Sequence, residues 1–426
     1  MAFCLPFSTA LTLIFSAFGT LFGLVGFDWE AFKKVIRHPI AILCVALFGW
    51  LALSMLWSIA PKHEMIEGIS KYRKLLYVPL IGMLLISTRV KPWFLMNFFV
   101  AGCLIVCAGS LFSSTGLAEL VLGPQNAGGA GWRLGGSPDK AWFLIGPPEK
   151  PTFGRAHIAQ GAFLTFSFLY LLGSLRIKKT THTNSITLEP ITSIYMLPAL
   201  SVLLFVMFNI GGMTGYVLTG CGLLLWIVGL YSRKKKVLAL ASSFFAITLL
   251  LLAYNTNSSV EKRVTKFKAD IYSYINADEY TSEGLRLSFW QAGLHYGLQS
   301  PIAGVGVGGY AEKYSLDMSQ PENLRLTRPH PHSEYILQLV QGGMVGLLLW
   351  GLLLASISFQ IKRSLNGYAV QKNREILSPH LVALVFMIDG LFNSVLWDAG
   401  EGHFFPVLFA TIASLSLKSE PGQMVP

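Results

Sequence analysis

The chain has 426 residues, of which 53% are hydrophobic and only 13% are charged, and its mean hydropathy is +0.54. Soluble domains carry roughly 25% charged residues, so this composition excludes a water-soluble fold. The formal net charge of +11 would suit a nucleic-acid-binding protein, but Lys and Arg stand in short clusters between apolar runs, as the positive-inside rule produces. The five cysteines all lie inside apolar runs, so neither a disulfide framework nor a metal site is indicated.

Runs of about 20 apolar residues, the length that crosses a bilayer, recur along the chain. The first run lacks the basic n-region and the A-x-A cleavage site of a signal peptide, so we interpret it as a retained span. No sequence repeat indicates a solenoid. We predict an all-α polytopic membrane protein with about 11–12 transmembrane helices. The predicted spans are 2–26, 39–59, 73–88, 93–117, 156–175, 192–209, 211–231, 236–254, 333–357, 379–396 and 403–418. Between the sixth and seventh, Asn209–Gly212 is either a tight turn or a kink.

Basic residues between the spans orient the chain, because cytoplasmic loops carry an excess of Lys and Arg. The predicted cytoplasmic clusters are 176–179, 233–236 and 362–374. The connection 397–402 has no Lys or Arg and is predicted to be external, and alternation places 118–155 and 255–332 outside as well. The C-terminus falls inside. Eleven spans put the N-terminus outside, and a twelfth would reverse that end alone.

The external segment 255–332 has an apolar pattern that predicts two helices. One is amphipathic and suited to lie along the membrane surface, with apolar residues at 260, 264, 267, 271 and 274. The second begins near Ser282, a good N-cap, and ends before Ser300 and Pro301. The predicted organisation is 1–254, spans 1–8 with the loop 118–155; 255–332, the external helical segment; and 333–426, the C-terminal spans and a cytoplasmic tail.

His332 is the candidate catalytic base. It follows Pro331 and directly precedes a predicted span, so it is expected at a helix N-terminus. The positive end of the helix dipole disfavours a second positive charge, so the imidazole is expected to be neutral. A neutral histidine that faces solvent can accept a proton. The alternative is a histidine that only caps the helix.

Four arginines are predicted to lie on the external face: Arg155, Arg286, Arg325 and Arg328. The guanidinium group binds phosphate oxygens through two parallel hydrogen bonds and stays charged. Several of them together at a membrane surface, with His330 beside them, would form a site for a lipid-linked phosphate or pyrophosphate. The alternative for any single arginine is contact with lipid headgroups.

Two further patterns are weak. The stretch GVGVGG (304–309) offers backbone amides for an anion, but a plain turn explains it equally well. His330-Pro331-His332 has the wrong geometry for two metal ligands on one helix face, and no H-E-x-x-H motif occurs. No metal and no cofactor are therefore predicted.

These residues resemble the O-antigen ligase/polymerase superfamily. The resemblance lies in GLRLSFWQAGLHYGLQSPIAGVGVGGY (284–310) followed by PHSEYILQLVQGGMVGLLLW (331–350). The stretches LWSIAPKHEMIEGISKYRKLLYVPL (56–80) and FNSVLWDAGEGHFFPVLFA (392–410) are similar to the flanking regions of the ligase branch. An arginine that the family carries near 209–220 is absent here, and Arg155 is our candidate for a substitute.

The resemblance implies a bacterial inner-membrane glycosyltransferase with a fold like that of the C-type glycosyltransferases. Such enzymes move a glycan from undecaprenyl pyrophosphate to the lipid A–core on the periplasmic side, without a metal. His332 and Arg286 match the family's catalytic positions, and Arg155, Arg325, Arg328 and His330 are expected to contact the substrate. Three alternatives remain open: an O-antigen polymerase, a protein O-oligosaccharyltransferase that uses the same donor, and a transporter of lipid-linked glycan.

Overall fold

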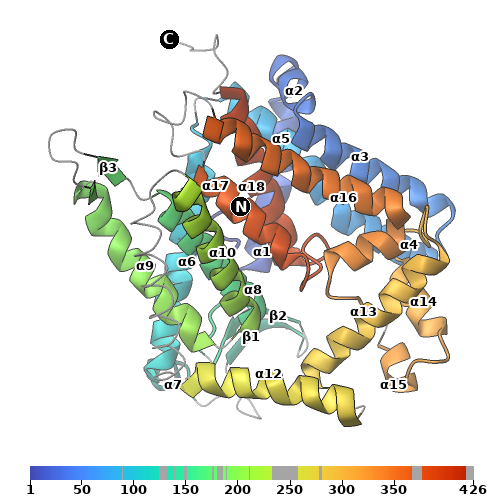
Figure 1. Ribbon diagram of the computed structural model, residues 1–426. Coiled ribbons are helices and arrows are strands. Elements are labelled where there is room, and N and C mark those ends of the chain that lie inside the picture. The colour runs from blue at the N-terminus through green and yellow to red at the C-terminus, as the bar shows by residue number, and fades with distance from the viewer. Residues whose placement is uncertain are drawn as a thin grey trace. The chain divides into compact units, whose positions relative to one another are not determined.

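The computed structural model describes the chain except for residues 89, 124–131, 138–139, 148–150, 175–176, 180–185, 189, 211, 233–257, 278–280, 328, 367–376 and 419–426. The chain forms two compact units, each built from three stretches of sequence. The first unit consists of Met1–Gly19, Trp93–Thr265 and Ser364–Val385, and the second of Thr20–Pro92, Lys266–Arg363 and Phe386–Pro426. Helices dominate the described residues of both (Figure 1).

The first unit contains most of α1 (Thr9–Val25) and α17 (Leu377–Asp389), together with α6 (Trp93–Ser114), α7 (Leu117–Leu122), α8 (His157–Ser174), α9 (Pro190–Ile210) and α10 (Met213–Ser232). Two short antiparallel hairpins join it: β1 (Trp132–Ser137) with β2 (Lys140–Ile145), and β3 (Ile177–Lys179) with β4 (Ile186–Leu188). The β1–β2 hairpin follows α7 within the predicted loop 118–155. Helix α9 ends at Ile210 and α10 begins at Met213, and because residue 211 lies outside the described residues, the choice between a turn and a kink stays a prediction.

The second unit contains α2 (Trp29–Ile36), α3 (Pro39–Leu53), η1 (Ser54–Leu56), α4 (Lys62–Tyr72), α5 (Lys74–Ser87), α13 (Ser282–Gln299), α14 (Gly309–Leu316), α15 (Glu322–Arg325) and α18 (Ala399–Lys418), with most of α12 (Ser258–Ala277) and of α16 (Glu334–Asn366). Helices α12 and α13 are the two that the pattern of 255–332 predicts. The N-cap of α13 is Thr281, whose hydroxyl accepts from the Gly284 N–H at 3.3 Å, one residue before the predicted Ser282.

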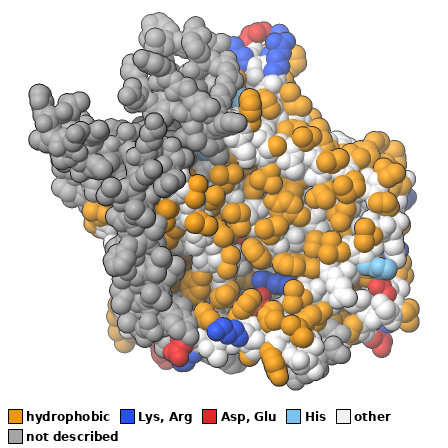
Figure 2. All heavy atoms as spheres, in the orientation of Figure 1, with side chains coloured by type: hydrophobic (Ala, Val, Ile, Leu, Met, Phe, Trp, Pro, Cys, Tyr) orange, Lys and Arg blue, Asp and Glu red, His pale blue; other side chains and the backbone are white. Residues whose placement is uncertain are grey.

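The prediction of an all-α polytopic membrane protein is confirmed. Three described helices are long and apolar enough to cross a membrane, at Pro39–Leu56, Trp93–Ser114 and Glu334–Gln360. The pair α1 and α2, bent by 115°, adds a fourth if it forms one broken span. Figure 2 shows hydrophobic side chains covering most of the face over α3 and α16, with charged side chains gathered at α2.

A helix lies at every predicted span but one, 236–254, which falls outside the described residues. The span predicted at 379–396 is shorter than expected, because α17 ends at Asp389 and residues 390–398 form a loop. The total of 11–12 crossings and the three-part division of the chain stay predictions. The two compact units divide the chain by packing, whereas that division follows the sides of the membrane.

The long helix α16 is broken at Gly343, whose φ of 64° and ψ of −162° leave the helical region. A broken helix within a membrane span leaves backbone groups that must find other partners. The turn 301–306 supplies them. Met344 N–H donates to Pro301 O (2.7 Å), Val345 N–H to Ile302 O (3.4 Å), Val305 N–H to Val340 O (2.8 Å) and Gly306 N–H to Gln341 O (3.1 Å).

Side chains from α3 and η1 complete the same arrangement. Trp50 Nε1 donates to Gly342 O at 2.7 Å, and the Val307 N–H donates to Ser54 Oγ at 3.0 Å. Five amides of the GVGVGG stretch, those of 304–307 and 309, thus donate to protein acceptors. Of the two interpretations of this stretch, these contacts support the plain turn.

Gly304→Ala tests the fit of this turn. Gly304 has φ +68°, and a Cβ there would lie 2.5 Å from Val340 O, so alanine must displace the turn from the α16 break. We expect the melting temperature of the purified protein in detergent to fall by several degrees. Gly351→Ala, in α16 with nothing within 4 Å of its Cβ position, is the control and should leave it unchanged or slightly raised. Equal melting temperatures for the two variants would contradict the role assigned to the turn.

Candidate functional site

His332 has a strained backbone. Its φ is 48°, and among the described residues it is the one non-glycine residue with positive φ. This left-handed conformation costs roughly 1–2 kcal/mol for an L-residue with a Cβ. The helix α16 begins two residues later, at Glu334, so His332 precedes a helix N-terminus as expected. The surrounding structure must therefore hold the His332 backbone in this conformation.

Glu334 fastens this segment to the loop 390–398. Its N–H donates to Gly390 O at 2.8 Å and to Asn393 O at 3.1 Å. Its buried carboxylate accepts from the Leu396 N–H at 2.9 Å and from Gln338 Nε2 at 2.8 Å. Because four hydrogen bonds converge on one residue, the chain just before it has little freedom to relax.

The two histidines lie together. Their ring centroids are 4.1 Å apart, and His330 Nδ1 lies 3.2 Å from Ser394 Oγ on the loop 390–398. The ring of Phe289, from α13, stacks on His332 with centroids 6.3 Å apart. His332 is thus held between an aromatic ring and a second imidazole.

Both imidazoles are neutral at neutral pH. Burial lowers the pKa of His332 to about 3, and His330 and Arg286 contribute in the same direction. Burial also lowers the pKa of His330 to about 4, with further contributions from Lys71 and Arg286. The expectation of a neutral His332 is therefore met, with burial as the leading cause rather than the helix dipole.

Arg286 lies one turn before Phe289 on α13. Its Nη1 is 3.4 Å from Glu283 Oε2, and it is close enough to both histidines to lower the pKa of each. The structure thus brings together the two residues predicted to be catalytic, although they are far apart in sequence. The contact that unites them is the packing of α13 against the start of α16.

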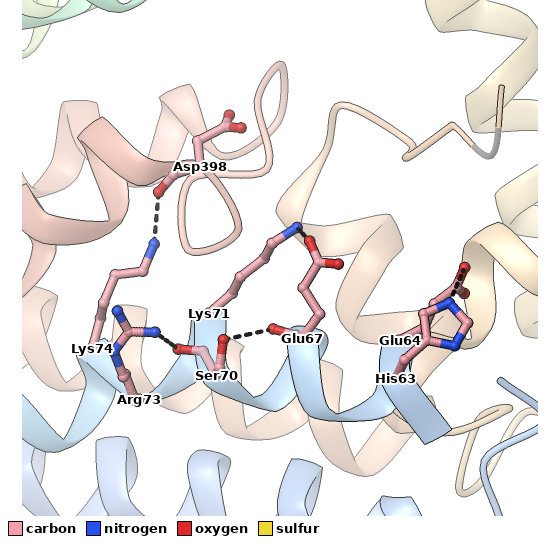
Figure 3. A network of polar contacts seen from close by, with 8 residues as sticks. All are labelled: His63, Glu64, Glu67, Ser70, Lys71, Arg73, Lys74 and Asp398. Atoms are coloured by element: carbon pink, nitrogen blue, oxygen red, sulfur yellow. Dashed lines mark hydrogen bonds and ion pairs between the residues drawn. The ribbon is translucent and has the colours of Figure 1, made fainter. Parts of the chain in front are cut away.

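Figure 3 shows a cationic cluster from α4 and α5 that the sequence analysis did not single out. Its Lys71 is close enough to His330 to lower the pKa of that histidine. Lys71 Nζ lies 3.9 Å from the centre of the Trp397 ring and 2.9 Å from Glu67 Oε1. The buried Lys74 donates from Nζ to the backbone oxygen of Asp398 at 2.7 Å. Burial raises the pKa of Asp398 to about 6, and the positive charges of Lys74 and Lys71 oppose this rise. Lys71 therefore acts electrostatically on both His330 and Asp398.

Asp389, at the end of α17, is also buried. Asn393 Nδ2 donates to its Oδ1 at 2.6 Å, which fits a structural role in shaping the loop 390–398.

The remaining predicted residues have other surroundings. Arg325 Nη1 donates to Met318 Sδ at 2.9 Å, in the loop between α14 and α15, and to Ser315 O at 3.5 Å, in α14. Arg328 lies outside the described residues. Arg155 belongs to the first unit, where it donates from Nε to Leu5 O at 2.7 Å and from Nη1 to Thr9 Oγ1 at 3.1 Å. Substrate contacts of Arg155, Arg325 and Arg328 stay predictions.

The signal for Lys71 was the sequence KYRK at 71–74, a basic cluster beside the start of a predicted span. Such clusters are read first as determinants of membrane orientation, and nothing in the local pattern links this one to a loop more than 300 residues away. Among the described residues, no group of three or more His, Cys, Asp or Glu side chains is placed to hold a metal ion.

In a comparison with known proteins, residues 198–351 match the model of the family described as O-antigen ligase. A Haemophilus influenzae protein described only as uncharacterized is 27% identical over 230 residues, which are 52% of this chain and 55% of that protein. An O-antigen ligase of Escherichia coli K12 is 24% identical over 125 residues, 28% of this chain and 30% of that protein. The matches thus span about half and less than a third of the lengths of these relatives. The family match covers α13, the GVGVGG turn, both histidines and the α16 break.

Acidification tests the burial of the histidine pair. The folded state lowers both histidine pKa values below the ordinary value of about 6.5, so the unfolded chain binds more protons than the folded chain. The free energy of unfolding therefore decreases as the pH decreases. The contribution of the neutral pair is complete above about pH 6.5 and is lost as pH falls toward 4.

We expect the melting temperature in detergent to fall less between pH 7.5 and 4.5 for the double variant His330→Gln/His332→Gln than for the parent. Asp398 and the other carboxylates titrate in both proteins, so the difference isolates the histidines. Parallel curves would show that the pair is not held neutral by the fold.

Proposed function

Starting from an O-antigen ligase match over residues 198–351, we propose that this protein is an O-antigen ligase. It transfers O-antigen glycan from undecaprenyl pyrophosphate to the lipid A–core oligosaccharide, at the periplasmic face of the bacterial inner membrane, and so completes lipopolysaccharide. The supporting observation is a neutral, strained His332 beside His330 and Arg286, with Lys71 near His330, just before a membrane span. A base beside fixed cations suits a reaction that takes a proton from a hydroxyl and releases a phosphorylated lipid.

The proposed reaction is a direct displacement. A hydroxyl of the acceptor sugar attacks the anomeric carbon of the glycan, and His332 removes its proton as the new C–O bond forms. The bond from the anomeric carbon to the pyrophosphate oxygen breaks, and its electron pair leaves with undecaprenyl pyrophosphate. Attack from the side opposite the leaving group inverts the anomeric configuration.

The leaving pyrophosphate gains negative charge, which must be stabilised. Arg286 can offer two parallel N–H donors and Lys71 an ammonium group, and both charges already act on the histidine pair. Fixed cations in this role make a divalent metal unnecessary, so we propose a metal-independent enzyme. Arg155, Arg325, Arg328 and His330 are proposed to contact the glycan or the pyrophosphate.

The low pKa of His332 in the free protein fits this scheme. A base with a pKa of about 3 is weak, but burial lowers that pKa most, and His330 and Arg286 lower it further. An anionic pyrophosphate bound at Arg286 would offset the positive charge and raise the pKa of His332. The base would thus strengthen when the donor is bound, which limits proton transfer to the loaded site.

The family match also fits an O-antigen polymerase, which extends a second lipid-linked glycan, or a protein O-oligosaccharyltransferase with the same donor. The purified protein should be given the lipid-linked donor with lipid A–core, with a second lipid-linked glycan, or with an acceptor protein. Transfer to lipid A–core supports the ligase. Transfer only to one of the other acceptors would replace it, and movement of the donor across liposomes without transfer would indicate a transporter.

His332→Ala should lower the transfer rate at least about 100-fold, the typical contribution of a general base. The matched control is His295→Ala, which changes an exposed histidine on α13 that lies 2.8 Å from Gln299 and should keep parent activity. Initial rates with purified donor and acceptor give the comparison. Full activity of His332→Ala would remove this residue as the base, and loss of parent activity in EDTA that Mg²⁺ restores would remove the metal-independent scheme.

Lys71→Gln should lower the transfer rate roughly 10- to 100-fold, because one cation near the leaving group is lost. Lys62→Gln, on the same helix and exposed, is the control and should behave as the parent. Added salt should weaken donor binding in the parent more than in Lys71→Gln. If both lysine variants keep full activity, the cationic cluster has only a structural role.

A further inference from the structure

The second half of the predicted external segment 255–332 has an unusual composition. No Asp, Glu, Lys or Arg occurs between Arg286 and Glu312. This stretch includes most of α13, the GVGVGG turn and the start of α14. An extramembrane segment would normally carry charged residues over such a length, whereas a segment in contact with lipid would not.

The packing of α13 on α16 is of the kind found between helices in membranes (Figure 1). Gly293 and Gly297, four residues apart, face α16. A Cβ at Gly293 would collide with the side chain of Ile336, and one at Gly297 would lie 2.7 Å from Leu339 Cγ. Small residues at this spacing let helix backbones approach closely, and such packing drives helix association in lipid, where the hydrophobic effect does not.

The turn 301–306 forms the tip of this segment. It contacts α16 well inside the predicted span, more than two helical turns beyond Glu334. The turn 301–306 bonds to α16 at Gly343, which follows Glu334 by nine positions, or roughly 13 Å along a helix axis. On the neighbouring span Pro39–Leu56, Trp50 reaches the same place and precedes the end of the span by six positions, or roughly 9 Å. If the hydrocarbon core, about 30 Å thick, begins at these span ends, both estimates put the turn in its outer half.

The outer face of α13 continues an exposed apolar surface. Leu294, Leu298 and Ile302 recur every four residues and are 49%, 75% and 74% exposed. The carbonyls of residues 301 and 302 bond to the amides of residues 344 and 345, where a second exposed stripe begins on the span of α16. That second stripe is Met344, Leu348 and Leu352, which are 45%, 58% and 52% exposed.

We propose that residues 287–311 enter the membrane as a re-entrant hairpin and that lipid acyl chains cover Leu294, Leu298 and Ile302. In water, the apolar stripes of α13 and α16 would form one continuous exposed hydrophobic patch, which is unfavourable. In the membrane, acyl chains would cover both stripes. The hairpin backbone is compatible with this depth, because its turn exchanges hydrogen bonds with the α16 break. The two polar side chains of the exposed face near the tip, His295 and Gln299, lie 2.8 Å apart and can bond to each other. Insertion leaves Arg286 near the N-terminal end of α13, at the level of the lipid headgroups.

Accessibility of single cysteines tests the insertion. Leu298→Cys and Ile302→Cys are made in the full chain, with Leu326→Cys as a control on the same external segment that is 77% exposed and follows the charged residues of α15. Leu348→Cys, on the α16 span, is the lipid reference. A membrane-impermeant maleimide is added to right-side-out and to inside-out membrane vesicles. Labelling is compared with that of the SDS-denatured protein and with the parent, whose native cysteines set the background.

We expect positions 298 and 302 to react at least about ten times more slowly than position 326, as position 348 does. Because all of these side chains are exposed in the protein, only lipid would account for the difference. Labelling of 298 and 302 at the rate of 326 would overturn the proposal. If position 326 reacts only in inside-out vesicles, the proposed periplasmic orientation of the site is wrong, while the comparison of 298 with 326 still decides the insertion.

A second measurement covers the case in which the maleimide reaches none of the positions. Leu298→Asp and Leu326→Asp are compared by melting temperature in lipid nanodiscs. A carboxylate among acyl chains is costly, so Leu298→Asp should melt several degrees lower, and Leu326→Asp should melt as the parent does. Equal melting temperatures would place α13 in water and contradict the proposal.

Discussion

The requirement that every backbone group within a membrane find a partner shapes the second unit. The break at Gly343 gives α16 unpaired amides and carbonyls, and the turn 301–306 pairs with them. That pairing fixes the end of α13, and α13 carries Arg286 and Phe289 to the start of α16. The site around His332 therefore depends on a backbone interaction that contains none of the site's own side chains.

Charge in the site is controlled by burial. The histidine pair is held neutral because it is half-buried beside Arg286 and Lys71, and the buried Glu334 fastens the strained segment to the loop 390–398. Lys74 and Lys71 oppose the loss of charge that burial imposes on Asp398. Arg286 and Lys71, each paired with a carboxylate on its own helix, thus stand next to imidazoles that carry no charge.

Several local features followed directly from the residues. Apolar runs located the helices, and Thr281, Ser300 and Pro301 bound α13 close to the predicted ends. The pairing of His332 with Arg286 was inferred from the resemblance rather than from spacing. The glycines of 304–309 showed that a tight turn was needed, but both an anion and a protein partner would have satisfied their amides. Only the tertiary contact with α16 distinguished the two.

The sequence alone determined that this is a helical membrane protein with basic and titratable groups before one span, because apolar length and local charge are properties of neighbouring residues. It could not show that Lys71 lies over Trp397, or that the strain at His332 is held by the loop 390–398. Those contacts join segments separated by up to about 330 residues, and in lipid the hydrophobic pattern does not specify which helix faces which. Close packing and backbone pairing decide that, and they exist only in the folded chain.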